Sequence, residues 1–254
     1  MTSLSYEDYE FICYVWIAMG LITFIILTFI KAPYGRHRSA GWGPEISARR
    51  GWIIMESIPV FLLTGLLLSG NNKETVVLIF WAIWTGHYIN RAFLWPYRAQ
   101  LEKKFMPISV VILAVIFNTV NCLINGIWLF QINDGYELTW LTDPRFIVGI
   151  GLFALGMIIN IKSDNILFTL REDGSTGYKI PRGGLFDRVS CPNYLGEIAE
   201  WLGFAIATWS LAGFTFAFWT FCNLAPRAFT HHRWYKEQFP EYPTNRKALI
   251  PFLI

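Results

Sequence analysis

The feature that most limits how this chain can fold is a series of long apolar runs. The first five lie at about Ile12–Ile30, Trp52–Leu68, Val76–Trp95, Pro107–Gln131 and Phe146–Ile161. A further apolar stretch, Tyr194–Ala225, is too long for one membrane helix, since roughly 20 residues span a bilayer. The segment Ser210–Gly213 would divide it into two. The pattern therefore predicts an all-α integral membrane protein with seven transmembrane helices.

The composition supports a membrane protein. Of the 254 residues, 54% are hydrophobic and only 15% are charged, whereas soluble domains carry about 25% charged residues. The segment Met1–Glu10 is acidic and lacks the basic n-region of a signal peptide, so we expect the first apolar run to remain as an uncleaved helix. No internal repeat or long linker interrupts the sequence, which predicts one membrane domain over residues 1–254.

Basic residues are distributed unevenly among the segments between the runs. If the N-terminus lies outside, all 21 Lys and Arg residues except Lys73 and Arg145 fall on the cytoplasmic side. Because cytoplasmic segments are enriched in Lys and Arg, this split predicts an outside N-terminus and a cytoplasmic C-terminus. Six spans would leave the basic tail outside. The expected location is the inner membrane of a bacterium, or the endoplasmic reticulum if the source is eukaryotic.

Two common kinds of site lack their motifs. The four cysteines form no CxxC pair and the four histidines form no HExxH, so neither a disulfide framework nor a metal site is expected. Nucleic acid is not an expected partner either. The GxGxxA match at Gly149–Ala154 lies inside an apolar run with no preceding strand, so close helix packing explains it better than a dinucleotide fold.

Three groups of polar residues recur at helical spacing near the cytoplasmic side. They are Asn160, Asp164 and Arg171; Asn193, Glu197 and Glu200; and Arg227, His231 and Tyr235. Residues three, four or seven apart share a helix face, and Pro192 fits the first position of the helix that carries the second group. Each group alone is more often a solvated helix end. Together, arginines suited to phosphate and carboxylates and amides suited to ribose and base edges predict a nucleotide pocket.

Two ionisable residues lie deeper in the apolar runs. Glu56 stands inside the second run and Tyr88 inside the third. A carboxyl group in hydrocarbon is costly, so it marks a functional site by default; alternatively, a protonated Glu56 donates a hydrogen bond between helices. Tyr88 alone would fit ordinary packing. An amide stripe on the fourth run either faces the same cavity or joins packed helices: Asn118, Asn121 and Asn125.

Several segments carry motifs in a specific order. They are Gly156–Asp164, Tyr178–Phe186, Asn193–Trp201, Ala205–Ser210, Arg227–Tyr235 and Arg246–Pro251. In this order they resemble the steroid 5α-reductase family over nearly the whole chain, and they are especially similar to the type 2 enzymes of vertebrates. A bacterial homologue is also compatible with the sequence. Thr230 stands where the family pattern has His, which leaves the substrate range open.

The resemblance implies a fold of seven transmembrane helices and NADPH-dependent reduction of the 4,5 double bond of 3-oxo-Δ4 steroids, with the steroid entering from the bilayer lipid. By position it implies catalytic roles for Glu56 and Tyr88. It implies cofactor contacts from a larger set: Asn160, Asp164, Arg171, Tyr178, Asn193, Glu197, Arg227, His231 and Tyr235. We expect three further residues to line the same cavity: Arg36, Trp52 and Arg91.

The implied chemistry suits these residue types. A hydride that reaches the β-carbon of an enone, here C5, pushes negative charge onto the 3-oxo oxygen, which then needs a hydrogen-bond donor in a dry site. A tyrosine hydroxyl keeps its proton at neutral pH and can donate it to a hydrogen bond, so Tyr88 fits this role. Glu56 would either share the carbonyl or orient the tyrosine.

Other functions remain open from the sequence. Membrane reductases of sterols or enoyl thioesters would keep NADPH and change the substrate. Membrane methyltransferases that use S-adenosylmethionine share the Pro-Asn-Tyr entry into a helix, but they typically carry His where this chain has Cys191. A non-enzymatic sterol-binding protein would not need the nucleotide-like polar groups.

Overall fold

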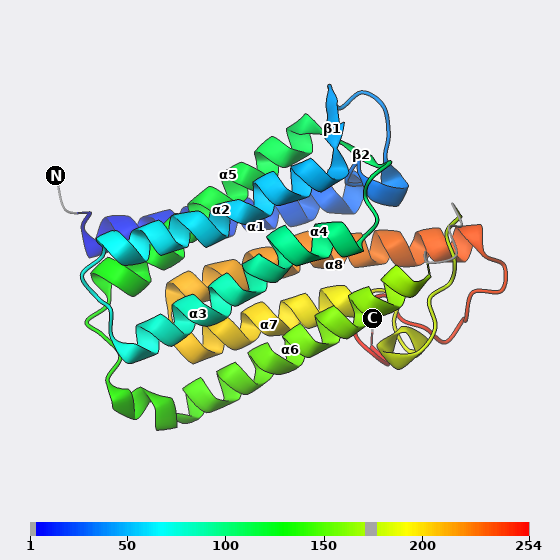
Figure 1. Cartoon of the computed structure of the whole chain (residues 1–254). Helices are drawn as coiled ribbons and strands as arrows, with labels where there is room; N and C mark the ends of the chain where they lie inside the picture. The colour runs from blue at the N-terminus through cyan, green and yellow to red at the C-terminus, as the bar shows by residue number, and fades with distance from the viewer. Residues whose placement is uncertain (1–3, 171–176, 254) are drawn as a thin grey trace. The chain divides into compact units, whose positions relative to one another are not determined.

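The structure, a computed structural model, describes residues 4–170 and 177–253 and is mainly helical over them (Figure 1). The α-helices are α1 (Tyr6–Phe29), α2 (Ala48–Ser69), α3 (Thr75–Ile89), α4 (Trp95–Arg98), α5 (Ile108–Ile127), α6 (Pro144–Thr169), α7 (Pro192–Thr208) and α8 (Leu211–Gln238). Two short strands, β1 (Glu45–Ser47) and β2 (Phe105–Pro107), pair antiparallel. The apolar pattern does not predict this pair, because each strand has only 3 residues.

The helices coincide with the predicted apolar runs. Among the described residues, four helical stretches are long and apolar enough to cross a membrane: Tyr6–Phe29, Ala48–Ser69, Ile108–Ile132 and Pro144–Thr169. The chain is thus a helical protein of the kind found in membranes. α3, α7 and α8 occupy the other predicted runs but do not meet the same criteria of length and composition; α7, for example, has 17 residues.

The predicted break in the last apolar stretch is confirmed. α7 ends at Thr208, and Trp209 takes a left-handed conformation with φ of 44°. Ser210 then caps α8, because its Oγ accepts a hydrogen bond of 3.0 Å from the Gly213 N–H. The stretch therefore forms two helices joined by a tight turn.

Contacts group the chain into two compact units. The first contains Met1–Cys13 and Ala32–Phe146, and the second contains Tyr14–Lys31 and Ile147–Ile254. α1 contributes to both units. Its start is held in the first unit by a 3.0 Å hydrogen bond from the Tyr9 hydroxyl to the Ile124 carbonyl. Its later part is held in the second, where the Trp219 indole donates to the Trp16 carbonyl at 2.6 Å.

Pro59 leaves one backbone carbonyl of α2 without its helical hydrogen bond, and a side chain of α5 supplies a replacement. A proline inside a helix has no N–H for the carbonyl four residues earlier, here that of Met55. The Asn118 side chain of α5 donates to this carbonyl at 2.7 Å, and Asn118 is itself buried. Of the two explanations for the amide stripe, Asn118 therefore fits the joining of packed helices.

α2 runs antiparallel to α3 (Figure 1) and contacts α3 at one level and α4 at another. The Trp81 indole of α3 donates to Thr64 Oγ1 of α2 at 3.2 Å. Further along, the rings of Trp52 and Trp95 lie 4.6 Å apart. Between α3 and α4 the helix widens into a π-helical turn, η2 (Asn90–Leu94), in which the Trp95 N–H bonds to the carbonyl five residues before it. Pro96, which follows the end of this turn by two residues, cannot donate to a regular helical ladder.

Glycines bring α6 and α7 of the second unit close together. A Cβ atom at Gly196 would lie 2.6 Å from the backbone nitrogen of Asn160, and one at Gly203 would lie 2.6 Å from the backbone carbonyl oxygen of Gly149. Gly156 contacts α7 in the same way. Only a residue without a side chain allows this approach. The packing explanation of the GxGxxA match is thus confirmed at Gly149, whereas Gly151 faces open space.

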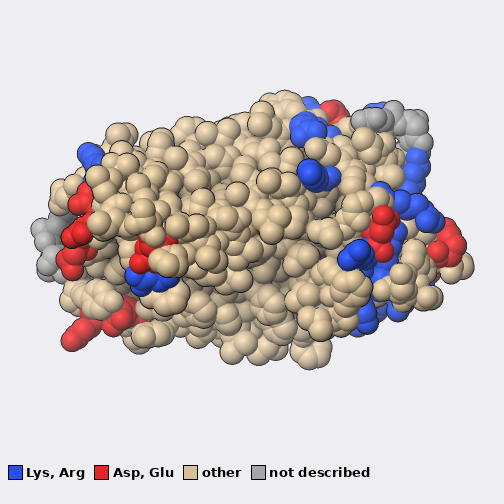
Figure 2. All heavy atoms as spheres, turned by 90° about the horizontal axis from the view of Figure 1, so that it is seen from below, with Lys and Arg blue, Asp and Glu red and all other residues tan. Residues whose placement is uncertain are grey.

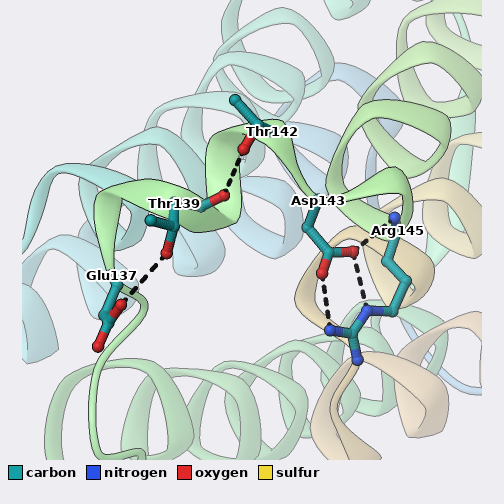
Figure 3. Close-up of polar contacts among 5 residues, drawn as sticks. All are labelled: Glu137, Thr139, Thr142, Asp143 and Arg145. Atoms are coloured by element: carbon teal, nitrogen blue, oxygen red, sulfur yellow. Dashed lines mark hydrogen bonds and ion pairs between the residues drawn. The ribbon is translucent and has the colours of Figure 1, made fainter.

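The start of α6 is held by a local polar arrangement (Figure 3). Asp143 accepts the Arg145 backbone N–H at 2.8 Å and also binds the Arg145 guanidinium through two hydrogen bonds of 2.9 and 2.8 Å. The Arg145 side chain is the main reason that the pKa of Asp143 is lowered to about 2, and its backbone N–H adds to the effect. Arg145, one of the two basic residues predicted outside, therefore has its charge paired within its own loop.

The surface of the helices is largely uncharged. On the face drawn in Figure 2, the Lys, Arg, Asp and Glu side chains gather near the helix ends, and the helix middles show other side chains. Along α1, large apolar side chains such as Phe11 and Phe29 are 68% and 83% exposed. Contiguous exposed apolar surface of this kind is typical of contact with lipid.

The contact between Asn118 and the Met55 carbonyl makes a testable prediction. Asn118→Leu should lower the free energy of unfolding by about 1–3 kcal/mol, because it leaves a buried carbonyl without a hydrogen bond. In a Pro59→Ala background the restored N–H of residue 59 bonds to that carbonyl, so the same replacement should cost clearly less. Thermal unfolding of the four proteins in detergent micelles measures both losses, and equal losses in the two backgrounds would contradict this account.

Candidate functional site

Two of the predicted polar groups meet in the second unit. The Asn160 side chain of α6 donates to the backbone carbonyl of Asn193 on α7 at 3.0 Å. The Asn193 side chain in turn donates to Asp164 Oδ1 at 3.3 Å. Asn160 and Asp164 are 3% and 5% exposed. Because Gly196 and Gly156 let the two helices touch, the first turn of α7 is fixed to α6 by these side chains.

Tyr194 joins α7 to α8. Its hydroxyl accepts a hydrogen bond of 3.1 Å from Arg227 Nη2 and lies 3.1 Å from His231 Nε2. The Arg227 guanidinium also lies over the Tyr194 ring at 5.3 Å, a distance typical of a cation–π contact. Arg227 and His231 are half-buried, so this group lies near the surface while its tyrosine link holds it in place.

The structure thus brings together residues from all three predicted groups. Asn193 and Tyr194 are neighbours at the start of α7, and they connect to different helices, α6 and α8. Glu197 follows one turn later on α7 and is half-buried, whereas Glu200 is fully buried. Arg171 lies outside the described residues.

The two predicted tyrosines of this unit lie in an aromatic cluster. Tyr235 is buried and stacks on Tyr242 with ring centroids 5.2 Å apart. Tyr178 is 43% exposed and meets the Trp234 ring edge-on at 5.0 Å. Their contacts with a cofactor stay a prediction.

The donors in this network fit an anionic nucleotide. Arg227 and His231 can donate hydrogen bonds to phosphate oxygens. Asp164 and the amides can bind hydroxyl and carboxamide groups. Within residues 4–170 and 177–253 no group of three or more His, Cys, Asp and Glu side chains is arranged to hold a metal ion.

The predicted catalytic pair lies in the first unit. Glu56 is half-buried on α2, and Tyr88 is 4% exposed on α3. Along the chain, Glu56 lies between Trp52 and Thr64, and Tyr88 lies between their respective contacts Trp95 and Trp81, so the two residues stand at a similar depth on antiparallel helices. The rings of Trp84 and His87 lie 5.7 and 5.0 Å from the Tyr88 ring. These neighbours keep the phenol in an aromatic environment.

Three of the remaining predicted residues also belong to the first unit. The Arg91 guanidinium lies 5.2 Å from the Trp52 ring and 5.0 Å from the Trp95 ring, so two indoles hold its charge. Arg36 is half-buried in the short 3₁₀-helix η1 (Gly35–His37). The π-helical turn η2 places Arg91 where it meets Trp52, and such turns are frequent at functional sites.

Sequence reasoning missed Tyr194 and Trp95. Helical spacing selected Asn193, Glu197 and Glu200 as one face, and the residue next to Asn193 points about 100° away from it. Tyr194 reaches Arg227 only because α8 packs on that other side of α7. One sequence signal could have identified Tyr194: it is an aromatic residue next to the predicted polar face of its helix, and the following helix carries Arg227.

Comparisons with known proteins agree with the predicted family. A family profile described as 3-oxo-5-alpha-steroid 4-dehydrogenase matches residues 104–254. A steroid 5-alpha-reductase DET2 of Gossypium hirsutum is 43% identical over 242 residues, which cover 92% of this chain and 93% of that protein. The 3-oxo-5-alpha-steroid 4-dehydrogenase 1 of Bos taurus is 41% identical over 249 residues, or 96% of each protein. The Homo sapiens enzyme of that name is 40% identical over 246 residues, covering 95% of this chain and 94% of the relative. The chain therefore belongs to the 3-oxo-5-alpha-steroid 4-dehydrogenase family and is an enzyme, an oxidoreductase.

Proposed function

We propose that this enzyme uses NADPH to reduce the 4,5 double bond of a 3-oxo-Δ4 steroid to the 5α-reduced 3-oxo product. The observation that carries the proposal is the polar network of α6, α7 and α8. The relatives that match this chain over nearly their full length are named as steroid 5-alpha-reductases or 3-oxo-5-alpha-steroid 4-dehydrogenases. A steroid-binding protein without catalysis would need no such network beside its apolar surface.

The network supports a role in holding the cofactor. Bound NADPH supplies the hydride. Arg227 and His231 would hold its phosphate groups, and Asn193, Asp164 and Asn160 would hold ribose or carboxamide groups. The wider proposed set also contains Arg36, Trp52, Arg91, Arg171, Tyr178, Glu197 and Tyr235. Buried polar groups that already hydrogen-bond one another need little rearrangement to meet a ligand, which lowers the cost of binding.

Tyr88 and Glu56 carry the other half of the proposed reaction. Hydride transfer to C5 would place negative charge on the 3-oxo oxygen, and the Tyr88 hydroxyl would donate a hydrogen bond to that oxygen until the enolate takes up a proton at C4. Glu56 either shares this carbonyl or orients the Tyr88 hydroxyl. Tyr88 is buried among Trp84 and His87, and exclusion of water strengthens such a hydrogen bond.

We also propose seven membrane spans with a cytoplasmic C-terminus. The steroid then enters from the lipid, while NADPH enters from the cytoplasm. The distribution of Lys and Arg supports this orientation, because only Lys73 and Arg145 fall outside and Arg145 is paired with Asp143. A reporter enzyme fused after residue 254 should therefore be active in the cytoplasm. An exterior signal from that fusion, with a cytoplasmic one from a fusion near Gly135, would contradict the topology.

The cofactor assignment predicts a loss of NADPH affinity in two variants. Asn193→Ala removes the amide that bridges to Asp164, and Glu197→Ala removes the next polar group on α7. Each should raise the Kd for NADPH, by about tenfold for every 1.4 kcal/mol of binding energy lost. Equilibrium titration of the purified protein in micelles measures this. Glu237→Ala, at the exposed end of α8, is the matched control and should leave the Kd unchanged. Unchanged affinity in both folded site variants would refute the assignment.

The catalytic assignment predicts a loss of rate without a loss of cofactor binding. Tyr88→Phe removes one hydroxyl, so single-turnover hydride transfer to a 3-oxo-Δ4 steroid should slow by roughly 10²–10³, as for one oxyanion donor. Tyr14→Phe, at an exposed position of α1, is the control. Glu56→Gln keeps the shape and tests the acid: a large loss indicates proton donation, and a small one indicates orientation.

The two catalytic variants should also be combined. If Tyr88 and Glu56 act on the same oxygen, the loss in the double variant will be smaller than the product of the single losses. A Tyr88→Phe protein that transfers hydride at the rate of the unmodified enzyme would eliminate Tyr88 and direct attention to Glu56 alone or to His87.

A further inference from the structure

A second polar cluster lies just before α7 and is not part of the proposed cofactor contacts. The Ser190 hydroxyl lies 2.6 Å from His232 Nδ1 and 2.7 Å from the Tyr242 hydroxyl, and it donates to the Lys247 carbonyl at 3.2 Å. Ser190 and Tyr242 are 3% and 5% exposed. One buried hydroxyl therefore joins three parts of the second unit: the segment before α7, the helix α8 and the segment after it.

Backbone pairing reinforces this junction. Val189 and Lys247 form a parallel bridge, with hydrogen bonds from the Lys247 N–H to the Arg188 carbonyl and from the Ser190 N–H to the Lys247 carbonyl, each 2.9 Å long. Next to it, the buried Arg246 donates to the Pro181 carbonyl at 2.9 Å. The segment after α8 thus holds the loop that leads into α7.

The junction is continuous with the proposed cofactor site. Ser190 precedes the first residue of α7, Pro192, by two positions, and Asn193 and Tyr194 follow immediately. Because a helix moves as a rigid piece over its first turn, a shift at Ser190 will pass to Asn193 and Tyr194. Their contacts with Asp164 and Arg227 are 3.3 and 3.1 Å long, so a small shift would break them.

We propose that Ser190, His232 and Tyr242 are positioning residues that set the first turn of α7, and through it the orientation of Asn193 and Tyr194 toward the cofactor. This inference rests on the proposed NADPH site. Because Ser190 is only 3% exposed, we place its effect in the start of the helix and not in direct contact with a ligand.

The two adjacent histidines make their hydrogen bonds through different ring nitrogens, and this difference can be tested by substitution. His231 meets Tyr194 through Nε2, whereas His232 meets Ser190 through Nδ1. The amide nitrogen of Asn occupies about the same place as Nδ1 of His, and that of Gln about the same place as Nε2. At position 232, Asn should therefore replace His and Gln should not.

The charge of His232 does not complicate this comparison. Burial is the main cause that lowers its pKa below the ordinary value, and the nearby positive charges of Lys236 and Lys247 lower it further. His232 is therefore neutral at neutral pH, so a neutral amide changes the hydrogen-bonding atom without removing a charge.

The experiment compares NADPH binding by the full-length protein and its His232→Asn and His232→Gln variants in detergent micelles at neutral pH. We expect the Kd of His232→Asn to stay within about twofold of the unmodified value, and that of His232→Gln and of Ser190→Ala to rise roughly 3- to 10-fold. In the Ser190→Ala background, Asn and Gln at position 232 should be equivalent, because the hydroxyl that distinguishes them is gone.

Several outcomes separate this inference from simpler explanations. If the unmodified protein does not bind NADPH, the proposed function fails first. If it binds and His232→Asn and His232→Gln give the same Kd, only the positioning role is overturned. If His232 served only the stability of the fold, His232→Gln would lower the melting temperature of the cofactor-free protein. The folded molecules would still bind NADPH with the Kd of the unmodified protein, and that result would overturn the positioning role. If His232→Gln does not fold, Ser190→Ala decides: an unchanged Kd overturns the proposal.

Discussion

Every backbone carbonyl of a helix in lipid needs a hydrogen-bond partner, and the helices of this protein depend on that constraint. Most carbonyls are satisfied within their own helix. Pro59 leaves that of Met55 without its helical donor, and Asn118 of α5 supplies one. At the end of the π-helical turn Trp128–Ile132, the Asn133 side chain donates to the carbonyls of Trp128 and Leu129 at 2.6 and 2.7 Å. The same amides that solve these local problems also fix which helices pack together.

Close helix packing is what turns separate polar residues into one network. Gly196 and Gly156 allow α6 and α7 to approach until the Asn160 side chain reaches the backbone carbonyl of Asn193. Larger residues would separate the helices by more than the tolerance of a hydrogen bond. On the other side of α7, Tyr194 spans the distance to Arg227 with a long side chain. A ligand site assembled from these helices is therefore as precise as the packing that supports it.

Much of this organisation could be predicted from the sequence. The apolar runs predicted where the helices lie, and the break near Ser210 was placed correctly because a polar residue and Gly213 mark it. Spacing predicted that Asn160 and Asp164 share one helix face and that Asn193 and Glu197 share another. The hydrogen bonds between helices could not be predicted, since they depend on which helix faces pack together. For this reason the contact of Tyr194 with Arg227 was missed. The π-helical turn at Asn90–Leu94 was missed too, because an apolar run does not reveal a wider turn.

The pairing of Arg188–Cys191 with Lys247–Ala248 also orders events in time. A ribosome completes α6 and α7 well before it adds Lys247, so the start of α7 lacks its partner segment while α8 is being made. The second unit can reach its final form only after those late residues emerge, even though α7 itself is already helical. A nascent chain stalled before position 247 would carry all of the helices and still lack a fixed start to α7.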